Sequence, residues 1–228
     1  MALGNRKRGA ALALLALLFF GFCALGVWQV ERRAWKLALI DRVEARVHAA
    51  PVELPSAFGD DEYLHVRVSG RYRYEAQVFT QAVTKEGSGY WVMTPLLRAD
   101  GSQLLVNRGF VPAESREAVR TGPDGEVQLT GLLRLSEPGG GFLRKNEPAA
   151  GRWFSRDVEA IGGGKFLPGR FLDADAAPAG TLPALPIGGL TVISFHNSHL
   201  VYALTWFGLA LMCVGAGWLV LRQQSAHA

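Results

Sequence analysis

The sequence predicts a membrane protein with two transmembrane helices that flank an all-β extracytoplasmic domain, antiparallel and barrel- or sandwich-like. Two uncharged apolar runs lie near the ends of the 228-residue chain. Between them, apolar and polar residues alternate over short stretches that are separated by turn residues, the pattern of half-buried strands. The middle of the chain therefore has strand signals, and its ends have the composition of membrane spans.

The two apolar runs cover residues 10–30 and 200–221, and neither contains a charged residue. A helix needs about 20 apolar residues to cross a bilayer, where only a helix or a closed barrel satisfies the backbone. Both runs are therefore predicted to be transmembrane helices rather than buried core helices. A cleaved signal peptide is a competing interpretation of the first run, but that run continues to Val30, beyond the length of an ordinary signal core.

The charges are unevenly spread. All 20 acidic residues and 20 of the 24 basic residues lie between Glu31 and Asp175, so the net charge of +4 comes from residues 6–8 and Arg222. The region between the spans carries no excess of positive charge. This balance argues against nucleic-acid binding.

The basic residues at the ends predict an orientation. Under the positive-inside rule, residues 1–9 and 222–228 stay in the cytoplasm, and the large domain at residues 51–199 faces the periplasm. The N-terminus lacks the Ser- and Arg-rich composition of a mitochondrial transit peptide. The expected location is a bacterial inner (plasma) membrane.

Between the spans we expect a helix and then strands. Residues 31–50 have apolar residues at helical spacing, which predicts an amphipathic juxtamembrane helix that Pro51 and Pro55 end. A short helix is expected at 153–161, and the Ala-, Pro- and Gly-rich stretch 174–189 is expected to be a loop. The predicted strands are 65–72, 77–84, 90–97, 103–111 and 127–135, with further candidates at 166–172 and 191–195.

The region between the spans offers little for catalysis. Both cysteines, Cys23 and Cys213, lie inside the apolar runs, which excludes a disulfide or a thiolate metal site from the exported domain. The sequence has no Gly-x-Ser-x-Gly, no His-Glu-x-x-His and no phosphate-binding glycine loop. We therefore predict that the protein is not an enzyme.

Histidine and aromatic residues gather where both helices reach the outer side of the membrane. His199, Tyr202 and Trp206 share one helical face at the start of the second span, because residues three or four apart lie on one side of a helix. The same spacing places a second set on one face at the end of the first span. That set is Trp28, Arg32 and Trp35.

These two faces are expected to form a cup of indoles around an imidazole, with Arg32 and Arg33 at its rim. Such a cup suits a flat, apolar cofactor with acidic groups, and haem is one: imidazole is a common axial ligand, and Arg can pair with propionates. His199 is then the residue that binds the haem iron. An ordinary aromatic belt is the alternative, since Trp and Tyr are enriched at membrane interfaces, and the spacing alone leaves both open.

Four blocks of sequence, in this order and with a span at each end, resemble the surfeit locus protein 1 family. The resemblance covers the chain from end to end. A weaker block between the third and fourth contains Asn146, Trp153 and Asp157. The four blocks are Leu25–Lys36, Gly70–Tyr72 with Gly89–Leu96, Val106–Pro112, and Asn197–Trp206.

The resemblance implies an assembly factor for haem-copper cytochrome c oxidase that binds haem a or delivers it to the catalytic subunit. In some bacterial members it implies haem a ligation by the histidine that matches His199. The implied partners are oxidase subunit I, the haem a synthesis enzymes and membrane lipid. Where the family has Arg-Asn-Asn-His, this chain reads His-Asn-Ser-His, so His196 is either a second ligand or a substitute donor.

Two other functions remain open at this point. The first is a scaffold that stabilises an immature oxidase subunit without touching haem. The second is an unrelated exported binding module that two spans tether to the membrane.

Overall fold

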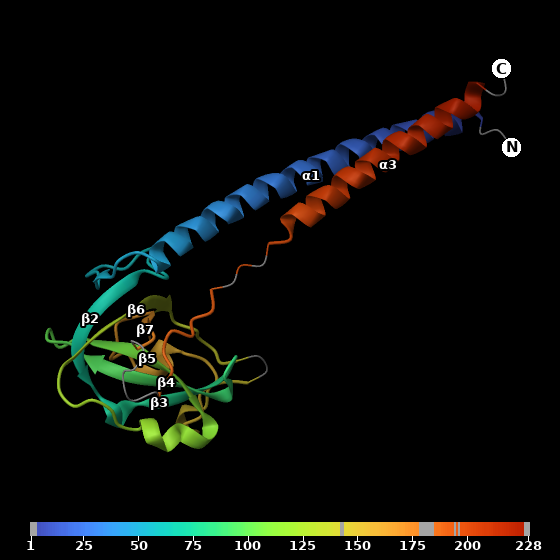
Figure 1. The fold of residues 1–228 in the computed structure, drawn as a ribbon. Coiled ribbons are helices and arrows are strands. Elements are labelled where there is room, and N and C mark those ends of the chain that lie inside the picture. Colours follow the sequence, from blue (N-terminus) through green and yellow to red (C-terminus); the bar gives the residue numbers. More distant parts are fainter. Residues whose placement is uncertain (1–3, 142–143, 178–184, 194, 196, 226–228) are drawn as a thin grey trace. The chain divides into compact units, whose positions relative to one another are not determined.

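The computed structural model describes residues 4–141, 144–177, 185–193, 195 and 197–225 (Figure 1). The chain divides into two compact units, each of which is described by itself. The helical unit contains residues 1–42 and 194–228, and the β-domain contains residues 43–193.

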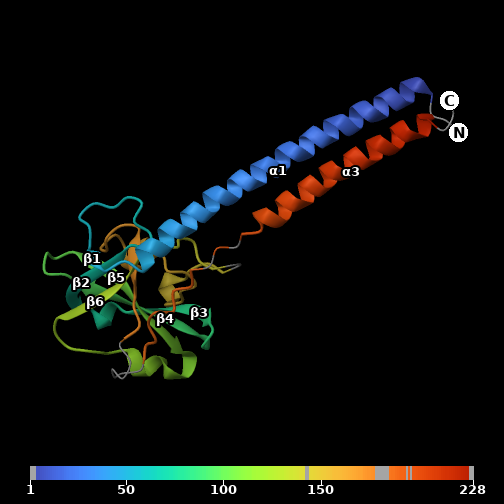
Figure 2. The same ribbon diagram turned by 45° about the horizontal axis from the view of Figure 1, so that its top comes forward.

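The helical unit consists of α1 (Asn5–Val47), whose last residues belong to the β-domain, and α3 (His199–Ser225). The two helices lie side by side in both ribbon views (Figures 1 and 2). They run antiparallel, because the Arg8 guanidinium donates a hydrogen bond to the Val220 carbonyl at 2.9 Å near one end of the pair. α1 continues without a break through the predicted span and the stretch that follows it.

Both helices have the properties of membrane spans. The stretches Arg6–Val47 and His199–Arg222 are long and apolar enough to cross a bilayer. Their apolar parts are almost wholly exposed, whereas the core helix of a soluble protein is mostly buried. The two helices therefore indicate a membrane protein.

In the described residues of the β-domain, the chain forms seven strands and four short helical segments. The strands are β1 (Val52–Glu53), β2 (His65–Tyr72), β3 (Val78–Thr84), β4 (Gly87–Leu97), β5 (Gln103–Pro112), β6 (Val127–Leu135) and β7 (Arg170–Ala174). The helical segments are η1 (Tyr74–Ala76), η2 (Ala113–Val119), η3 (Pro148–Ala150) and α2 (Val158–Gly162).

The strands form one sheet that closes on itself. Their order is β1-β2-β6-β7-β5-β4-β3, and β2 also pairs with β4 through Arg71↔Leu97 and Tyr72↔Leu96. A ring therefore runs through β2, β6, β7, β5 and β4 and back to β2. Closure removes the exposed edges of these five strands, while β1 and β3 lie at the two ends of the order.

The prediction of a purely antiparallel sheet is wrong in part. β5 and β7 pair in parallel, with Leu105 opposite Phe171, and the short β1 pairs in parallel with β2. A closed ring of five strands cannot alternate in direction throughout, because an odd number of strands leaves two neighbours that point the same way. The pair β5–β7 is the one that satisfies this requirement.

The core occupies both faces of β5. Leu104 and Val106 are fully buried in a cluster with residues of β2 and β7, such as Val66 and Leu172. Leu105 points to the opposite face and is buried against Val158 of α2. Because both faces are covered, β5 has a continuous apolar run rather than an alternating one.

Several predicted elements have different bounds in the structure. The short helix expected at 153–161 begins only at Val158, because Trp153 forms a bridge with Thr80 and the Asp157 side chain caps the helix by accepting a hydrogen bond from Ala160 N. The strand expected at 166–172 is β7, shifted towards the C-terminus.

The strand predicted at 191–195 is wrong for the described residues of that stretch, namely 191–193 and 195, which belong to no strand. The chain pairs with β5 earlier instead, through the bridge Ile187↔Phe110. Gly109 permits this approach, since a Cβ at that residue would lie 2.3 Å from the Ile187 carbonyl oxygen.

Candidate functional site

The seam between α1 and α3 carries the candidate site. On α1 the residues at the seam are spaced like a heptad, with Phe22, Gly26 and Gln29 in succession. Phe22 stacks against Trp206 of α3 with ring centroids 5.8 Å apart. From α3, small residues such as Ala203 are buried at the seam, which lets the helix backbones approach closely.

His199 and Gln29 meet across this seam. His199 Nδ1 lies 2.7 Å from Gln29 Oε1, and Gln29 is only 9% exposed. An amide oxygen only accepts hydrogen bonds, so Nδ1 is the protonated nitrogen that donates. In a neutral imidazole, donation from Nδ1 leaves the lone pair on Nε2.

The aromatic residues predicted on α1 share a face, but that face lies beside the seam. Trp28 and Trp35 are 53% and 49% exposed, and the Arg32 guanidinium lies over the Trp35 ring at 3.9 Å from its centroid. One residue along a helix is a rotation of about 100°. Gln29, and not Trp28, therefore faces His199.

Arg32 and Arg33 were both predicted at the rim of the cup, and Arg33 is the half-buried one. It lies one turn beyond Gln29, and therefore on the face of α1 that meets α3. Arg33 is therefore on the same side of α1 as the contact with His199, whereas the Arg32 guanidinium is stacked on the Trp35 ring.

The predicted residues of α3 also differ in whether they lie in the seam. Trp206 packs into the seam, where its indole Nε1 is buried and has no hydrogen-bond partner among the described residues. Tyr202 is 53% exposed and lies outside the seam. His196 lies outside the described residues. Cofactor binding by any of these residues stays a prediction.

The contact of His199 with Gln29 fits one requirement of a haem ligand. A histidine that ligates a metal usually donates its other ring N–H to an acceptor, and the His199–Gln29 contact has this arrangement. Exposed indole and phenol rings on either side, from Trp28 and Tyr202, supply apolar surface. Among the residues that the structure describes, no group of three or more His, Cys, Asp or Glu side chains gathers as a metal site.

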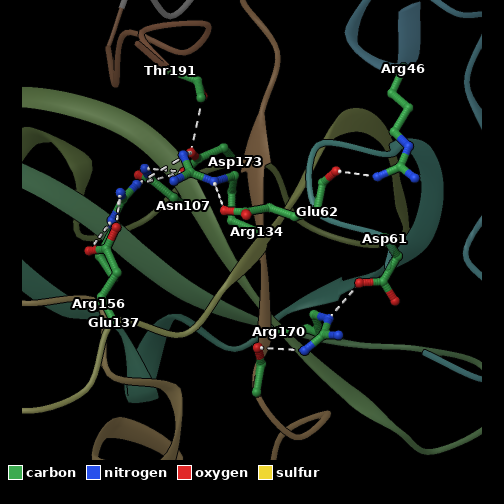
Figure 3. Close-up of polar contacts among 11 residues, drawn as sticks. Arg46, Asp61, Glu62, Asn107, Arg134, Glu137, Arg156, Arg170, Asp173 and Thr191 are labelled. Atoms are coloured by element: carbon green, nitrogen blue, oxygen red, sulfur yellow. Dashed lines mark hydrogen bonds and ion pairs between the residues drawn. The ribbon is translucent and has the colours of Figure 1, made fainter. Parts of the chain in front are cut away.

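A second polar cluster, which the sequence did not predict, surrounds a buried carboxylate in the β-domain (Figure 3). Asp173 of β7 is 3% exposed. Its carboxylate accepts hydrogen bonds from Asn107 Nδ2 at 2.8 Å, Arg134 at 3.2 Å, Arg156 at 3.1 Å and Thr191 Oγ1 at 3.0 Å.

More ion pairs extend this cluster on both sides. Arg156 also pairs with Glu137, and burial alone would lower the pKa of Arg156, but the Asp173 and Glu137 carboxylates outweigh it and raise that pKa. Arg134 lies 3.5 Å from Glu62. Because donors from β5 and β6 occupy the lone pairs of Asp173, this carboxylate joins β7 to both of these strands.

Comparison with known proteins gives one consistent match. Residues 16–211 match the SURF1 family. The chain is 37% identical to surfeit locus protein 1 of Homo sapiens over 222 residues, which cover 87% of this chain and 72% of that protein. It is 35% identical to the Rattus norvegicus protein of the same name over 87% of this chain and 71% of that protein.

A more distant relative is matched over more of its length. The chain is 32% identical to a SURF1-like protein of Monosiga brevicollis over 243 residues, which cover 97% of this chain and 91% of that protein. The similarity therefore includes the helices at both ends as well as the β-domain.

Proposed function

The chain belongs to the SURF1 family, and from this premise we propose that it binds haem a during the assembly of a haem-copper cytochrome c oxidase, with His199 as the residue that would hold the iron. The family is known for cytochrome c oxidase assembly factors, which are generally not enzymes. Haem binding is the specific part of the proposal.

The observation that carries the proposal is the state of His199. Its Nδ1 is occupied by Gln29 at 2.7 Å, which leaves Nε2 as the nitrogen with a lone pair. The Nδ1–H tautomer leaves Nε2 able to bind a metal. An ionisable residue at the end of an apolar span also favours a functional role.

The chain's own residues have distinct parts in this proposal. When bound, haem a would supply an iron that accepts a nitrogen ligand and carboxylates that pair with cations. His199 offers the nitrogen, Trp28 and Tyr202 offer exposed aromatic surface, and Arg33 is the cation on the face of α1 that meets α3.

We also propose where the protein works and with what. Basic residues at 6–8 and Arg222 flank the spans on one side. By the positive-inside rule they support a bacterial inner-membrane protein with both termini in the cytoplasm and the β-domain in the periplasm. His199 then lies at the outer leaflet. Its partners in this proposal are the haem a synthesis enzymes, as the source of haem a, and oxidase subunit I, as the recipient.

An optical spectrum of the detergent-purified protein tests the proposal. Wild type and His199→Ala are produced in cells that also make haem a, and are compared side by side. A haem a spectrum in the wild type that is lost or shifted in the variant supports His199 as the ligand. Colourless preparations of both would overturn haem binding.

A scaffold without haem is the second candidate, and one feature of the β-domain favours it. Val83 and Val192 are 83% and 81% exposed, and together with Trp91 they line a groove of about 320 Å³. Exposed apolar side chains that line one groove mark a surface for another protein. In this case oxidase subunit I co-purifies with wild type and with His199→Ala, but not with Val83→Asp.

A further inference from the structure

We propose that Gln29 is a positioning residue: it fixes the tautomer and the ring orientation of His199 so that the lone pair of Nε2 would be available to the haem iron. The inference rests on the proposed haem function and adds a residue to it. It starts from a contact between residues 170 positions apart, in which His199 Nδ1 lies 2.7 Å from Gln29 Oε1.

The place of Gln29 in the sequence makes it unusual. Between Ala10 and Val30, Gln29 is the sole residue whose side chain carries an amide, a hydroxyl or a charge. The indole of Trp28 is another polar group in this run. Gln29 is nevertheless 9% exposed at the seam. Burying an amide without a hydrogen-bond partner is unfavourable, so the contact with His199 offsets the cost of having Gln29 there.

The chemistry of the two side chains determines which nitrogen of His199 carries the proton. In a neutral imidazole one nitrogen donates and the other accepts. Without an acceptor at Nδ1, the proton of His199 is free to occupy either nitrogen, and an Nε2–H form cannot ligate a metal through Nε2. The Gln29 oxygen selects the Nδ1–H form and so leaves the Nε2 lone pair available.

The packing around Gln29 holds it in place. One turn before it, Gly26 lies so close to α3 that a Cβ there would be 2.6 Å from the Phe207 ring. One turn further, Phe22 stacks on Trp206. Because both contacts fix the distance between the helices, the reach from Gln29 to His199 is set by the seam rather than by the side chain alone.

The first experiment needs no haem. Full-length protein is labelled with ¹⁵N-histidine, produced in cells that make no haem a, and placed in detergent micelles, where His199→Ala assigns the His199 signals among the five histidines. We expect a single Nδ1–H tautomer in the wild type and a mixture in Gln29→Met, which keeps the length of the side chain but offers no amide oxygen. Identical His199 signals in both would overturn the proposal.

The second experiment titrates the same proteins with ferric haem a. Loss of a residue that orients a metal ligand typically weakens binding by about 10- to 100-fold, which is the loss we expect for Gln29→Met. Gln29→Glu keeps an oxygen acceptor and should recover part of the lost affinity for haem a. Val30→Met, at a neighbouring position that is 49% exposed, is the matched control and should bind like the wild type.

The two experiments separate the possible failures. A wild type that binds no haem a overturns the proposed function, and positioning towards iron with it, whatever the nitrogen signals show. A wild type that binds haem a, together with a Gln29→Met variant of equal affinity and identical spectrum, leaves the proposed function standing and overturns the role of Gln29.

Discussion

The Cβ position of Gly26 on α1 lies 2.6 Å from Cε1 of Phe207 on α3, so the phenyl ring occupies the space that a side chain at residue 26 would need. No real Cβ approaches a ring atom this closely without a shift. The absence of a side chain at Gly26 thus allows the two spans to pack as they do.

Gly26→Val should therefore weaken the helix pair. Overpacking of a tight contact costs about 1–3 kcal/mol, and we expect a lower midpoint of thermal unfolding, followed by near-ultraviolet circular dichroism in detergent. Gly21→Val on the same helix is the control, since no heavy atom lies within 4 Å of its Cβ position. Adding Phe207→Ala to Gly26→Val should recover stability; no recovery would mean that the clash lies elsewhere.

Asp173→Asn should destabilise the β-domain. The substitution leaves two half-buried guanidiniums, those of Arg134 and Arg156, without the carboxylate between them, and breaking a buried ion pair costs about 3–5 kcal/mol. Chemical denaturation of the full-length protein in detergent measures the change. Glu117→Gln, which breaks an exposed pair with Arg120, should leave the midpoint unchanged.

The stability of the β-domain should also depend on pH through His65. Burial alone would lower the pKa of His65, but its hydrogen bonds to the Ala49 carbonyl and to Asp175 outweigh this and raise the pKa above its ordinary value. Both partners accept, so both ring nitrogens donate and the charged form is favoured in the folded state.

The sign of the pH effect follows from the raised pKa. The contribution of His65 to stability is fully present below the unfolded pKa of about 6.5 and is lost as the pH rises through the higher folded value. The difference in unfolding midpoint between wild type and His65→Gln should therefore be largest in acid and shrink above neutral pH. His48→Gln, at an exposed position, serves as the control. A constant difference at every pH would exclude a charged His65.

The proposed orientation can be tested with single cysteines. After Cys23 and Cys213 are replaced by Ser, a cysteine at Val83, which is 83% exposed in the β-domain, should react with a membrane-impermeant thiol reagent in intact spheroplasts. A cysteine at Ala228 should react only after lysis. Labelling of the C-terminal cysteine in intact spheroplasts would show that the orientation is reversed.

Much of the β-domain could be predicted from local pattern. β2 and β6 have the predicted bounds, 65–72 and 127–135. In β2 one face packs on the core and the other does not, which produces alternation. β1, with two residues, is too short to give any period. The direction of β7 could not be predicted either, since periodicity is the same for parallel and antiparallel pairing.

In the candidate site, too, the local features could be predicted from the sequence and the contact between distant residues could not. The sequence placed His199 at the start of the second span and predicted that Trp28, Arg32 and Trp35 share a face, because helical spacing is a local property. It did not identify Gln29, although a lone amide in an apolar run is the signal by which it could have been found.

The sequence by itself therefore determined the two apolar spans, most of the strands and the family, since each depends on composition, period or a local motif. The tertiary structure decided which sides of these elements meet. Closure of an odd ring required a parallel pair, β5–β7. The rotation of α1 against α3 brought Gln29 rather than Trp28 to His199. Both outcomes depend on contacts between residues far apart in the chain, and no local pattern contains them.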